Sequence, residues 1–77
     1  MVQAYILIQT EVAKTRDVAV AISGISGVVR VTVVTGPYDI IVLTEASTLD
    51  DLGHLVVSKV QSVPGISRTT TCTAVNV

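Results

Sequence analysis

Two stretches of the chain repeat one pattern, and this repeat limits the folds that are open to the sequence. Residues 25–30 read ISGVVR and residues 63–68 read VPGISR. In both places a glycine follows a stretch with apolar residues at helical spacing and precedes a β-branched run of strand length. Each half of the chain is therefore expected to contain a strand, a helix and a second strand.

Four strands and two helices are predicted from these local patterns. Thr15 is expected to cap the first helix and Thr48 to begin the second, because a threonine hydroxyl can accept a hydrogen bond from the first helical turn. Asp50 and Asp51 follow in the first turn of the second helix, where negative charge suits the helix dipole. The predicted elements are strands over 2–10, 28–35, 38–45 and 66–75, and helices over 16–23 and 48–63.

The order strand–helix–strand–strand–helix–strand describes two βαβ halves joined by a hairpin. It predicts an α+β, ferredoxin-like βαββαβ fold with a four-stranded antiparallel sheet. Right-handed crossovers place both helices on one face of the sheet and leave the other face bare. Apolar residues such as Ile40, Val42, and Ile6 or Leu7 are expected on the bare face, which would bury them against another subunit.

Alternation and helical spacing also predict which residues share a face within single elements. In the strand over 28–35, three valines are expected on one face, with Arg30 and Thr32 on the other. These valines are Val29, Val31 and Val33. The apolar stripe of the second helix is expected to consist of Leu49, Leu52, Val56, Val60 and Val63.

The size and composition of the chain predict that it associates with itself. A domain of 77 residues has a marginal core, yet 49% of these residues are hydrophobic and only 14% are charged. The single cysteine, Cys72, cannot form an internal disulfide, and no Cys/His cluster offers a metal site. The apolar surface is therefore expected to be shared in a dimeric α/β sandwich or barrel, or in a larger assembly.

Charge and hydropathy argue against DNA and membranes as direct partners. The formal net charge is -1, and the five basic residues are scattered rather than gathered in a patch. No apolar run approaches the roughly 20 residues that a membrane helix needs, and the N-terminus has no targeting pattern. Together with the unpaired cysteine, this predicts a cytoplasmic location.

Few side chains are available for catalysis. His54 is an isolated histidine in the second predicted helix, and Cys72 lies between threonines, where a buried, inert thiol is expected. The sequence has neither a nucleophile elbow nor a glycine-rich phosphate loop. We predict no catalysis, no cofactor and no metal. The alternative is a small dimeric ferredoxin-like enzyme, which would have to use His54, Asp39 and the tyrosines as acid–base groups.

The segment VTGPYD, at residues 34–39, connects two predicted strands and holds more than a turn requires. In one interpretation Gly36 permits a positive φ angle, Pro37 fixes the turn and Tyr38 packs at the end of the sheet. Asp39 would then accept a hydrogen bond from a backbone amide of the turn. In the other interpretation the segment is half of a site for a zwitterion. Asp39 then pairs with an ammonium group, the Gly36 amide binds a carboxylate, and Tyr38 supplies an apolar wall with a hydroxyl.

A row of threonines in the last strand also allows two interpretations. Thr69, Thr71 and Thr73 are expected to point to one face, with Thr70 and Cys72 on the other. Threonine has a high strand propensity and suits an edge strand that is partly exposed to solvent, which would explain the row by itself. Alternatively, the hydroxyls line a polar pocket that binds a small ligand.

Several of these segments together resemble the effector-binding (RAM) domain of the leucine-responsive/asparagine-regulator (Lrp/AsnC) transcription factors. They are VTGPYDIIV, TLDDLGHLVVSKV and VPGISRTTT, and the resemblance extends over residues 4–75. It implies a homodimer that assembles into an octamer or decamer, with an amino acid or related effector bound where dimers meet, near the hairpin. The positions that match the family's binding residues are Gly36, Tyr38 and Asp39 in the hairpin, and Thr69 and Thr71 in the last strand.

The first predicted strand begins at residue 2, which leaves no room for the helix-turn-helix domain that such factors usually carry. Residues 1–77 are therefore expected to form a single ligand-binding domain that modulates transcription indirectly. The leading hypothesis is an oligomeric module that senses an amino acid. The alternative is an adaptor that co-assembles with full-length Lrp/AsnC-type regulators without a ligand.

Overall fold

A computed structural model describes residues 1–75, which form one four-stranded antiparallel sheet and two helices. The elements are β1 (Val2–Thr10), α1 (Thr15–Ser23), β2 (Val28–Val33), β3 (Ile40–Ala46), α2 (Leu49–His54), its π-helical continuation η1 (Leu55–Val60) and β4 (Ile66–Thr73). The strands lie in the order β2-β3-β1-β4. This arrangement confirms the ferredoxin-like βαββαβ fold.

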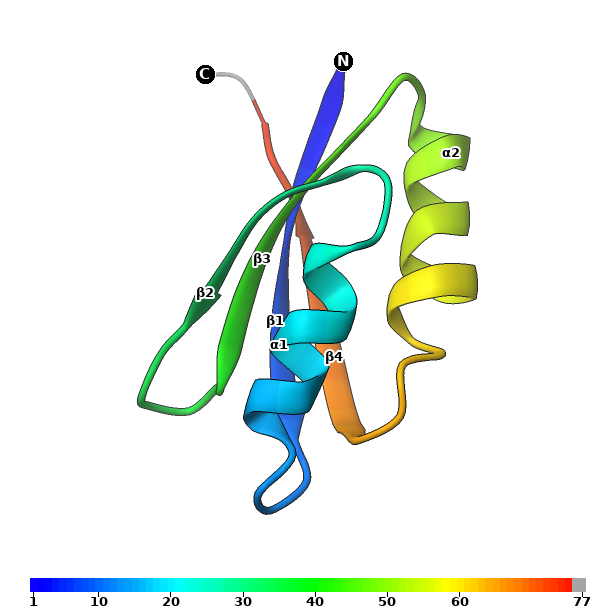
Figure 1. Cartoon of the computed structure of the whole chain (residues 1–77). Helices are drawn as coiled ribbons and strands as arrows, with labels where there is room; N and C mark the ends of the chain where they lie inside the picture. Colours follow the sequence, from blue (N-terminus) through cyan, green and yellow to red (C-terminus); the bar gives the residue numbers. More distant parts are fainter. Residues whose placement is uncertain (76–77) are drawn as a thin grey trace.

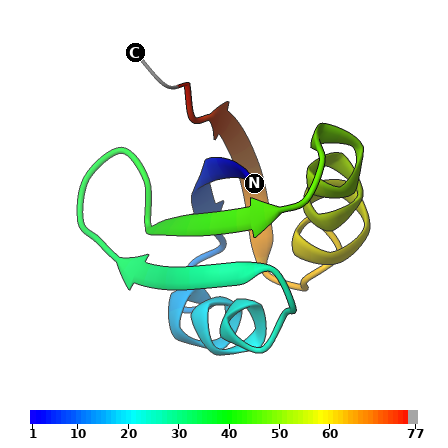
Figure 2. The ribbon, with the colours of Figure 1, turned by 90° about the horizontal axis from the view of Figure 1, so that it is seen from above.

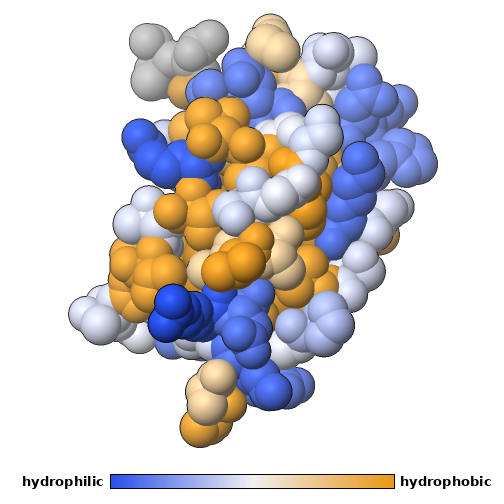
Figure 3. Space-filling view, viewed as in Figure 1, coloured by the Kyte–Doolittle hydropathy of each residue, from blue (hydrophilic) through white to orange (hydrophobic). Residues whose placement is uncertain are grey.

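Both helices lie on one side of a strongly twisted sheet. In Figure 1, α1 crosses in front of the strands and α2 runs alongside them. The view from above in Figure 2 shows that the other side of the sheet is uncovered. On the helix-bearing side, hydrophobic side chains form a band down the middle of the molecule, with hydrophilic side chains along the margin where α2 lies (Figure 3).

The hydrophobic core lies between the helices and the sheet. Its main cluster consists of Ile6, Ile8, Val18, Ile22, Ile40, Val42, Val56 and Val60, and a smaller cluster consists of Ala4, Leu52 and Leu55. The register places Ile6 opposite Val42 and Ile8 opposite Ile40, so these residues share the face that the helices cover. The expectation that Ile6, Ile40 and Val42 lie on the bare face is therefore wrong. Both strands are apolar on both faces, so alternation alone does not identify the face that meets the helices.

The bare face of the sheet is lined by the alternate residues. Tyr5 pairs with Leu43 and Cys72, and Leu7 pairs with Ile41. Leu7 therefore lies where it was expected, and with Ile41 and Leu43 it is half-buried, while Tyr5 is 42% exposed. Cys72 is exposed as well, so the prediction of a buried thiol is wrong. No second layer from residues 1–75 covers this face.

An irregularity in β2 changes the expected pattern of its valines. The register with β3 shifts between Val28 and Arg30, which makes Val29 an unpaired extra residue with 53% of its surface exposed. Val31 and Val33 remain on the helix-facing side, opposite Val42 and Ile40. The prediction holds for those two valines and fails for Val29, because a bulge adds one residue to the alternation.

The second helix begins as predicted and buries Leu52, Val56 and Val60 of the predicted stripe, with Val63 packed against the core. Thr48 is its N-cap, and the Thr48 hydroxyl accepts a hydrogen bond of 3.1 Å from the Asp51 amide. Leu49 is 63% exposed and does not belong to the core, whereas Leu55 is buried. Leu55 follows the buried Leu52 by three residues, an ordinary helical spacing, so the buried face is wider than the predicted stripe rather than displaced from it.

The remaining differences concern the ends of elements. α1 begins at Thr15 itself, with Lys14 at the N-cap and no side-chain cap, so Thr15 does not cap the helix. β2 ends at Val33 and β3 begins at Ile40, which makes the loop between them longer than predicted. β4 ends at Thr73, before the predicted end of the last strand.

Candidate functional site

The hairpin loop between β2 and β3 projects beyond the end of the sheet. It is closed by a hydrogen bond of 2.9 Å from the Val34 amide to the Asp39 carbonyl. Gly36 has a φ of 148°, in the region that favours glycine, and no atom lies within 4 Å of where its Cβ would be. Gly36 is exposed, while Tyr38 and Asp39 are half-buried. The tip of the loop therefore offers its backbone to an approaching group.

The side chain of Asp39 fastens this loop to the end of β1. Its Oδ2 accepts a hydrogen bond of 2.8 Å from the Thr10 amide and one of 3.2 Å from the Thr10 hydroxyl. The Asp39 amide donates to the Ile8 carbonyl at 2.8 Å, and Gln9 Nε2 donates to the Pro37 carbonyl at 2.9 Å. The Asp39 carboxylate thus has a structural role, but the backbone amide that donates to it belongs to Thr10 in β1 and not to the turn.

The hydrogen bonds of Asp39 leave part of the carboxylate available. Within residues 1–75 they use Oδ2 alone, so Oδ1 keeps its capacity to accept hydrogen bonds. The network continues from the Thr10 hydroxyl to the Thr15 hydroxyl, 2.6 Å away at the start of α1. Nothing in the sequence indicated this connection, because the three residues lie in three different segments.

The predicted threonines lie on the helix-facing side of β4. Thr69 is opposite Ile8 and Thr71 is opposite Ile6, so the two threonines share a face as predicted. The Thr69 hydroxyl accepts a hydrogen bond of 3.1 Å from Gln61 Nε2, a residue that sequence reasoning missed. That contact depends on how the turn after η1 folds back, for which no local pattern gives a signal.

Thr71 lines a hollow of about 360 Å³ between the second helix and β4. The lining residues are Leu49, Leu52, Gly53, Val56, Val57, Gln61, Thr71 and Thr73. The walls are therefore mainly apolar, with two hydroxyls and one amide. This composition suits an aliphatic or thioether group attached to a polar head.

The hairpin residues and the threonines do not meet within one chain. Ile8 pairs with Ile40 on one side and with Thr69 on the other, so β1 separates the two groups by two strand spacings, or about 10 Å. The Asp39 carboxylate turns toward Thr10, and the hollow at Thr71 includes no hairpin residue. One chain therefore presents two separate half-sites.

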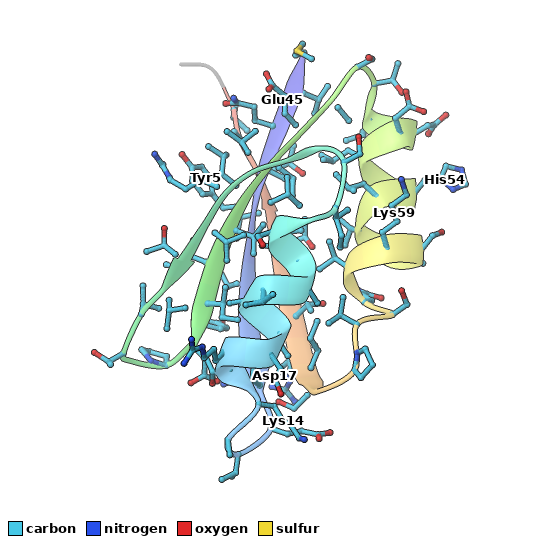
Figure 4. All side chains as sticks on the ribbon, in the orientation of Figure 1. Tyr5, Lys14, Asp17, Glu45, His54 and Lys59 are labelled. Atoms are coloured by element: carbon cyan, nitrogen blue, oxygen red, sulfur yellow. The ribbon has the colours of Figure 1, made fainter. Side chains whose placement is uncertain are left out.

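A second hollow, of about 470 Å³, lies at the other end of the sheet. Its lining residues are Ser26, Gly27, Glu45, Ala46, Ser47, Asp51, His54, Leu55, Ser58 and Lys59. In Figure 4, Lys59 lies on the front of the second helix and His54 projects away from α1.

Within residues 1–75, no group of three or more His, Cys, Asp or Glu residues is placed to hold a metal ion. In the same part of the chain, no helix is long and apolar enough to cross a bilayer.

Comparison with known proteins identifies the class to which this fold belongs. Residues 3–77 match the family described as the Lrp/AsnC ligand binding domain, and the chain belongs to this family. It is similar to the HTH-type transcriptional regulator PH1916 of Pyrococcus horikoshii, with 34% identity over 56 residues. That match covers 73% of this chain and 37% of the regulator, so the chain corresponds to well under half of that relative.

Solved structures agree with this assignment. The crystal structure of FFRP-DM1 is similar to the chain with a TM-score of 0.93 and 37% identity, covering 97% of this chain and 100% of that one. The transcriptional regulator NMB0573 from Neisseria meningitidis, solved as a complex with L-Met, has a TM-score of 0.86. It is 18% identical and covers 97% of this chain and 50% of its own, so this likeness shows the fold alone.

Proposed function

We propose that the chain is a regulatory module that binds an amino acid, or a closely related small molecule, at an interface between its own copies. The observation that carries this proposal is the hairpin. It combines an exposed glycine backbone with a half-buried carboxylate that keeps one oxygen available. An ammonium group would pair with Asp39 Oδ1, and a carboxylate would accept a hydrogen bond from the Gly36 amide, with Tyr38 as the wall.

The second half of the proposed site comes from a neighbouring copy. Thr69 and Thr71 are separated from the hairpin of their own chain by β1, so they would contact a ligand held by the hairpin of another copy. The apolar hollow beside Thr71 would take the ligand's side chain. A site divided in this way makes ligand binding depend on assembly, which is how a small molecule could regulate an oligomer.

Self-association is proposed on independent grounds. Tyr5, Leu7, Ile41 and Leu43 lie side by side on the uncovered face of the sheet. Packing this face on its equivalent in a second copy would give the dimeric α/β sandwich, and further contacts would give an octamer or decamer. The family membership and the L-Met complex of the Neisseria regulator support an amino acid as the ligand.

The proposed effect on transcription is indirect. Residues 3–77 match the ligand-binding domain of a regulator family, and their few basic residues are scattered along the chain. Contact with DNA would come from full-length Lrp/AsnC-type regulators that co-assemble with this domain. We also place the chain in the cytoplasm, whose reducing conditions suit the free and exposed Cys72.

A second candidate, an adaptor without a ligand, is favoured by one observation. Asp39 Oδ2 is already occupied by Thr10, so the carboxylate has a structural use whether or not a ligand binds. An adaptor would pull down a full-length relative equally well with and without amino acids. A sensor would pull down an amount of the relative that changes with the amino acid present.

Mixing two inactive variants tests the divided site. Asp39→Asn removes the charge from the hairpin half, and Thr71→Val removes the hydroxyl from the other half. After the two variants are unfolded and refolded together, chance assembly should restore about a quarter of the wild-type binding capacity in calorimetry, since each site takes its halves from different copies. Thr70→Val, on the opposite face of β4, is the matched control; since Thr70 pairs with Leu7 on the uncovered face, its assembly is checked by sedimentation, and the assembled variant should bind as the wild type does. A mixture that binds no more than its separate components would contradict a shared site.

A further inference from the structure

Gly53 lies within the second helix at a position where the fold does not require glycine. Glycine lowers helix stability relative to alanine because it loses more conformational freedom on folding. Gly53 is not among the glycines with a positive φ angle, and no atom lies within 4 Å of where its Cβ would be. A side chain at this position would therefore meet no obstacle within residues 1–75, and the glycine leaves free a space that a side chain would fill.

This free space belongs to the hollow between the second helix and β4, which the proposed function gives to the ligand's side chain. Gly53 and Thr73 both line the hollow. Thr73 pairs with Ala4, and Ala4 shares a buried cluster with Leu52, the residue before Gly53. Gly53 and Thr73 therefore lie at the same end of the hollow.

The opposite end of the hollow is polar. There Gln61 Nε2 donates a hydrogen bond of 3.1 Å to the Thr69 hydroxyl, and Thr71 lies between Thr69 and Thr73 on the same face of β4. From Thr71 to Thr73 the strand advances about 7 Å. An unbranched side chain of four heavy atoms extends roughly 5–6 Å from the Cα to its last carbon. A ligand whose polar head lies at Thr71 would thus place the end of such a side chain beside Gly53.

The walls of the hollow suit an uncharged side chain. Among residues 1–75, those that line it include no charged residue. A charged ligand side chain would lose its hydration there without gaining a partner of opposite charge. The apolar walls, by contrast, would contact an aliphatic or thioether chain along its length. They consist of Leu49, Leu52, Val56 and Val57.

We propose that Gly53 determines how long a side chain the ligand site accepts, and that the site selects amino acids with long, uncharged aliphatic or thioether side chains, such as norleucine and methionine. With glycine at this position the far end of the hollow is open, whereas a larger residue would occupy it. The inference rests on the proposed function, because it takes Thr71 as the position of the ligand's polar head.

A homologous series of amino acids tests this proposal in calorimetry. Alanine, 2-aminobutyrate, norvaline and norleucine differ by one methylene at each step. In the wild type each methylene should tighten binding about fourfold, so that norleucine binds about 60-fold more tightly than alanine. In Gly53→Leu norleucine should bind at least about tenfold more weakly than in the wild type, because the contacts of about two methylenes are lost. Gly53→Ala, which favours the helix, should show a smaller loss. Alanine does not reach Gly53 and should bind all three proteins alike.

Ser58→Leu is the matched control, because Ser58 is exposed on the same helix and lines other hollows but not this one. It should keep the wild-type preference for norleucine. Urea denaturation and sedimentation check that each variant folds and assembles as the wild type does. If Gly53→Leu binds norleucine as tightly as the wild type, or loses alanine and norleucine equally, Gly53 does not determine the accepted length.

Two results for the wild type separate this inference from the proposed function. A wild type that binds a charged amino acid, but no member of the homologous series, would contradict the inference and leave the proposed function in place. A wild type that binds no amino acid at all would contradict both.

Discussion

Removing the carboxylate of Asp39 should lower the stability of the folded chain by about 2 kcal/mol. Two hydrogen bonds would be lost from Oδ2, one of 2.8 Å to the Thr10 amide and one of 3.2 Å to the Thr10 hydroxyl. A hydrogen bond to a charged acceptor contributes about 1.5–3 kcal/mol, and an amide that loses its only partner adds a desolvation cost. Because Asp39 is half-buried and the bond of 3.2 Å is too long to contribute much, we expect about 2 kcal/mol, the lower part of the range for a single bond of this kind.

Urea denaturation of Asp39→Ala at a fixed protein concentration measures this loss, since association would otherwise change the apparent stability. In a thermal melt the same loss should lower Tm by about 10 °C for a domain of this size. Asp39→Asn keeps an acceptor oxygen and should lose only about 1 kcal/mol. Glu11→Ala removes an exposed carboxylate and serves as the control, with a change within about 0.5 kcal/mol. If Asp39→Ala is as stable as this control, Asp39 does not fasten the hairpin to β1.

Four further substitutions test other parts of the fold. Gly27→Ala should lower the free energy of unfolding in urea by about 2 kcal/mol, because φ is 98° and the new Cβ would lie 2.8 Å from Leu55 Cδ2. An unchanged free energy of unfolding would show that the loop relaxes. Thr48→Ala should lose about 1 kcal/mol with its N-cap bond to the Asp51 amide, and helical circular dichroism should fall with it. Ile6→Ala should lower the free energy of unfolding by about 2–5 kcal/mol, because Ile6 is fully buried. Leu7→Ala should change the assembly measured by sedimentation more than it changes folding. Equal losses of folding stability for the two variants would contradict the assignment of the two sheet faces.

Element order and fold class could be predicted from the sequence because each depends on local patterns. Apolar runs, the two glycine-containing exits and the hairpin at residues 34–39 identify the four strands and two helices. The face of each strand could not be predicted, because in β1 and β3 both faces are apolar. Ile6, Ile40 and Val42 were placed on the wrong side for this reason.

Two other errors have causes that single-sequence patterns do not contain. The bulge in β2 displaces Val29, and Leu49, at the first position of α2, stays exposed. Only the packing of the whole chain decides where a strand bulges and where the buried face of a helix begins. The exposure of Cys72 depends likewise on which face of the sheet is left uncovered.

The candidate site shows the same division between what is local and what is not. The composition of the hairpin and the threonine row are visible in the sequence, and so is the shared face of Thr69 and Thr71. The bond from Asp39 to Thr10 and the one from Gln61 to Thr69 join residues that are separated by turns, so no spacing rule indicates them. The separation of the hairpin from the threonines follows from the strand order.

A thermal-shift screen against the common amino acids at millimolar concentration, on the wild type and on Asp39→Asn, tests the proposed function most directly. A ligand present at a hundred times its Kd should stabilise the folded chain by about 2.7 kcal/mol, or about 15 °C in Tm. We expect such a shift for one or a few amino acids in the wild type, and its loss in Asp39→Asn. A wild type that is folded and assembled but shows no shift with any amino acid would contradict a role as an amino-acid sensor and favour the adaptor.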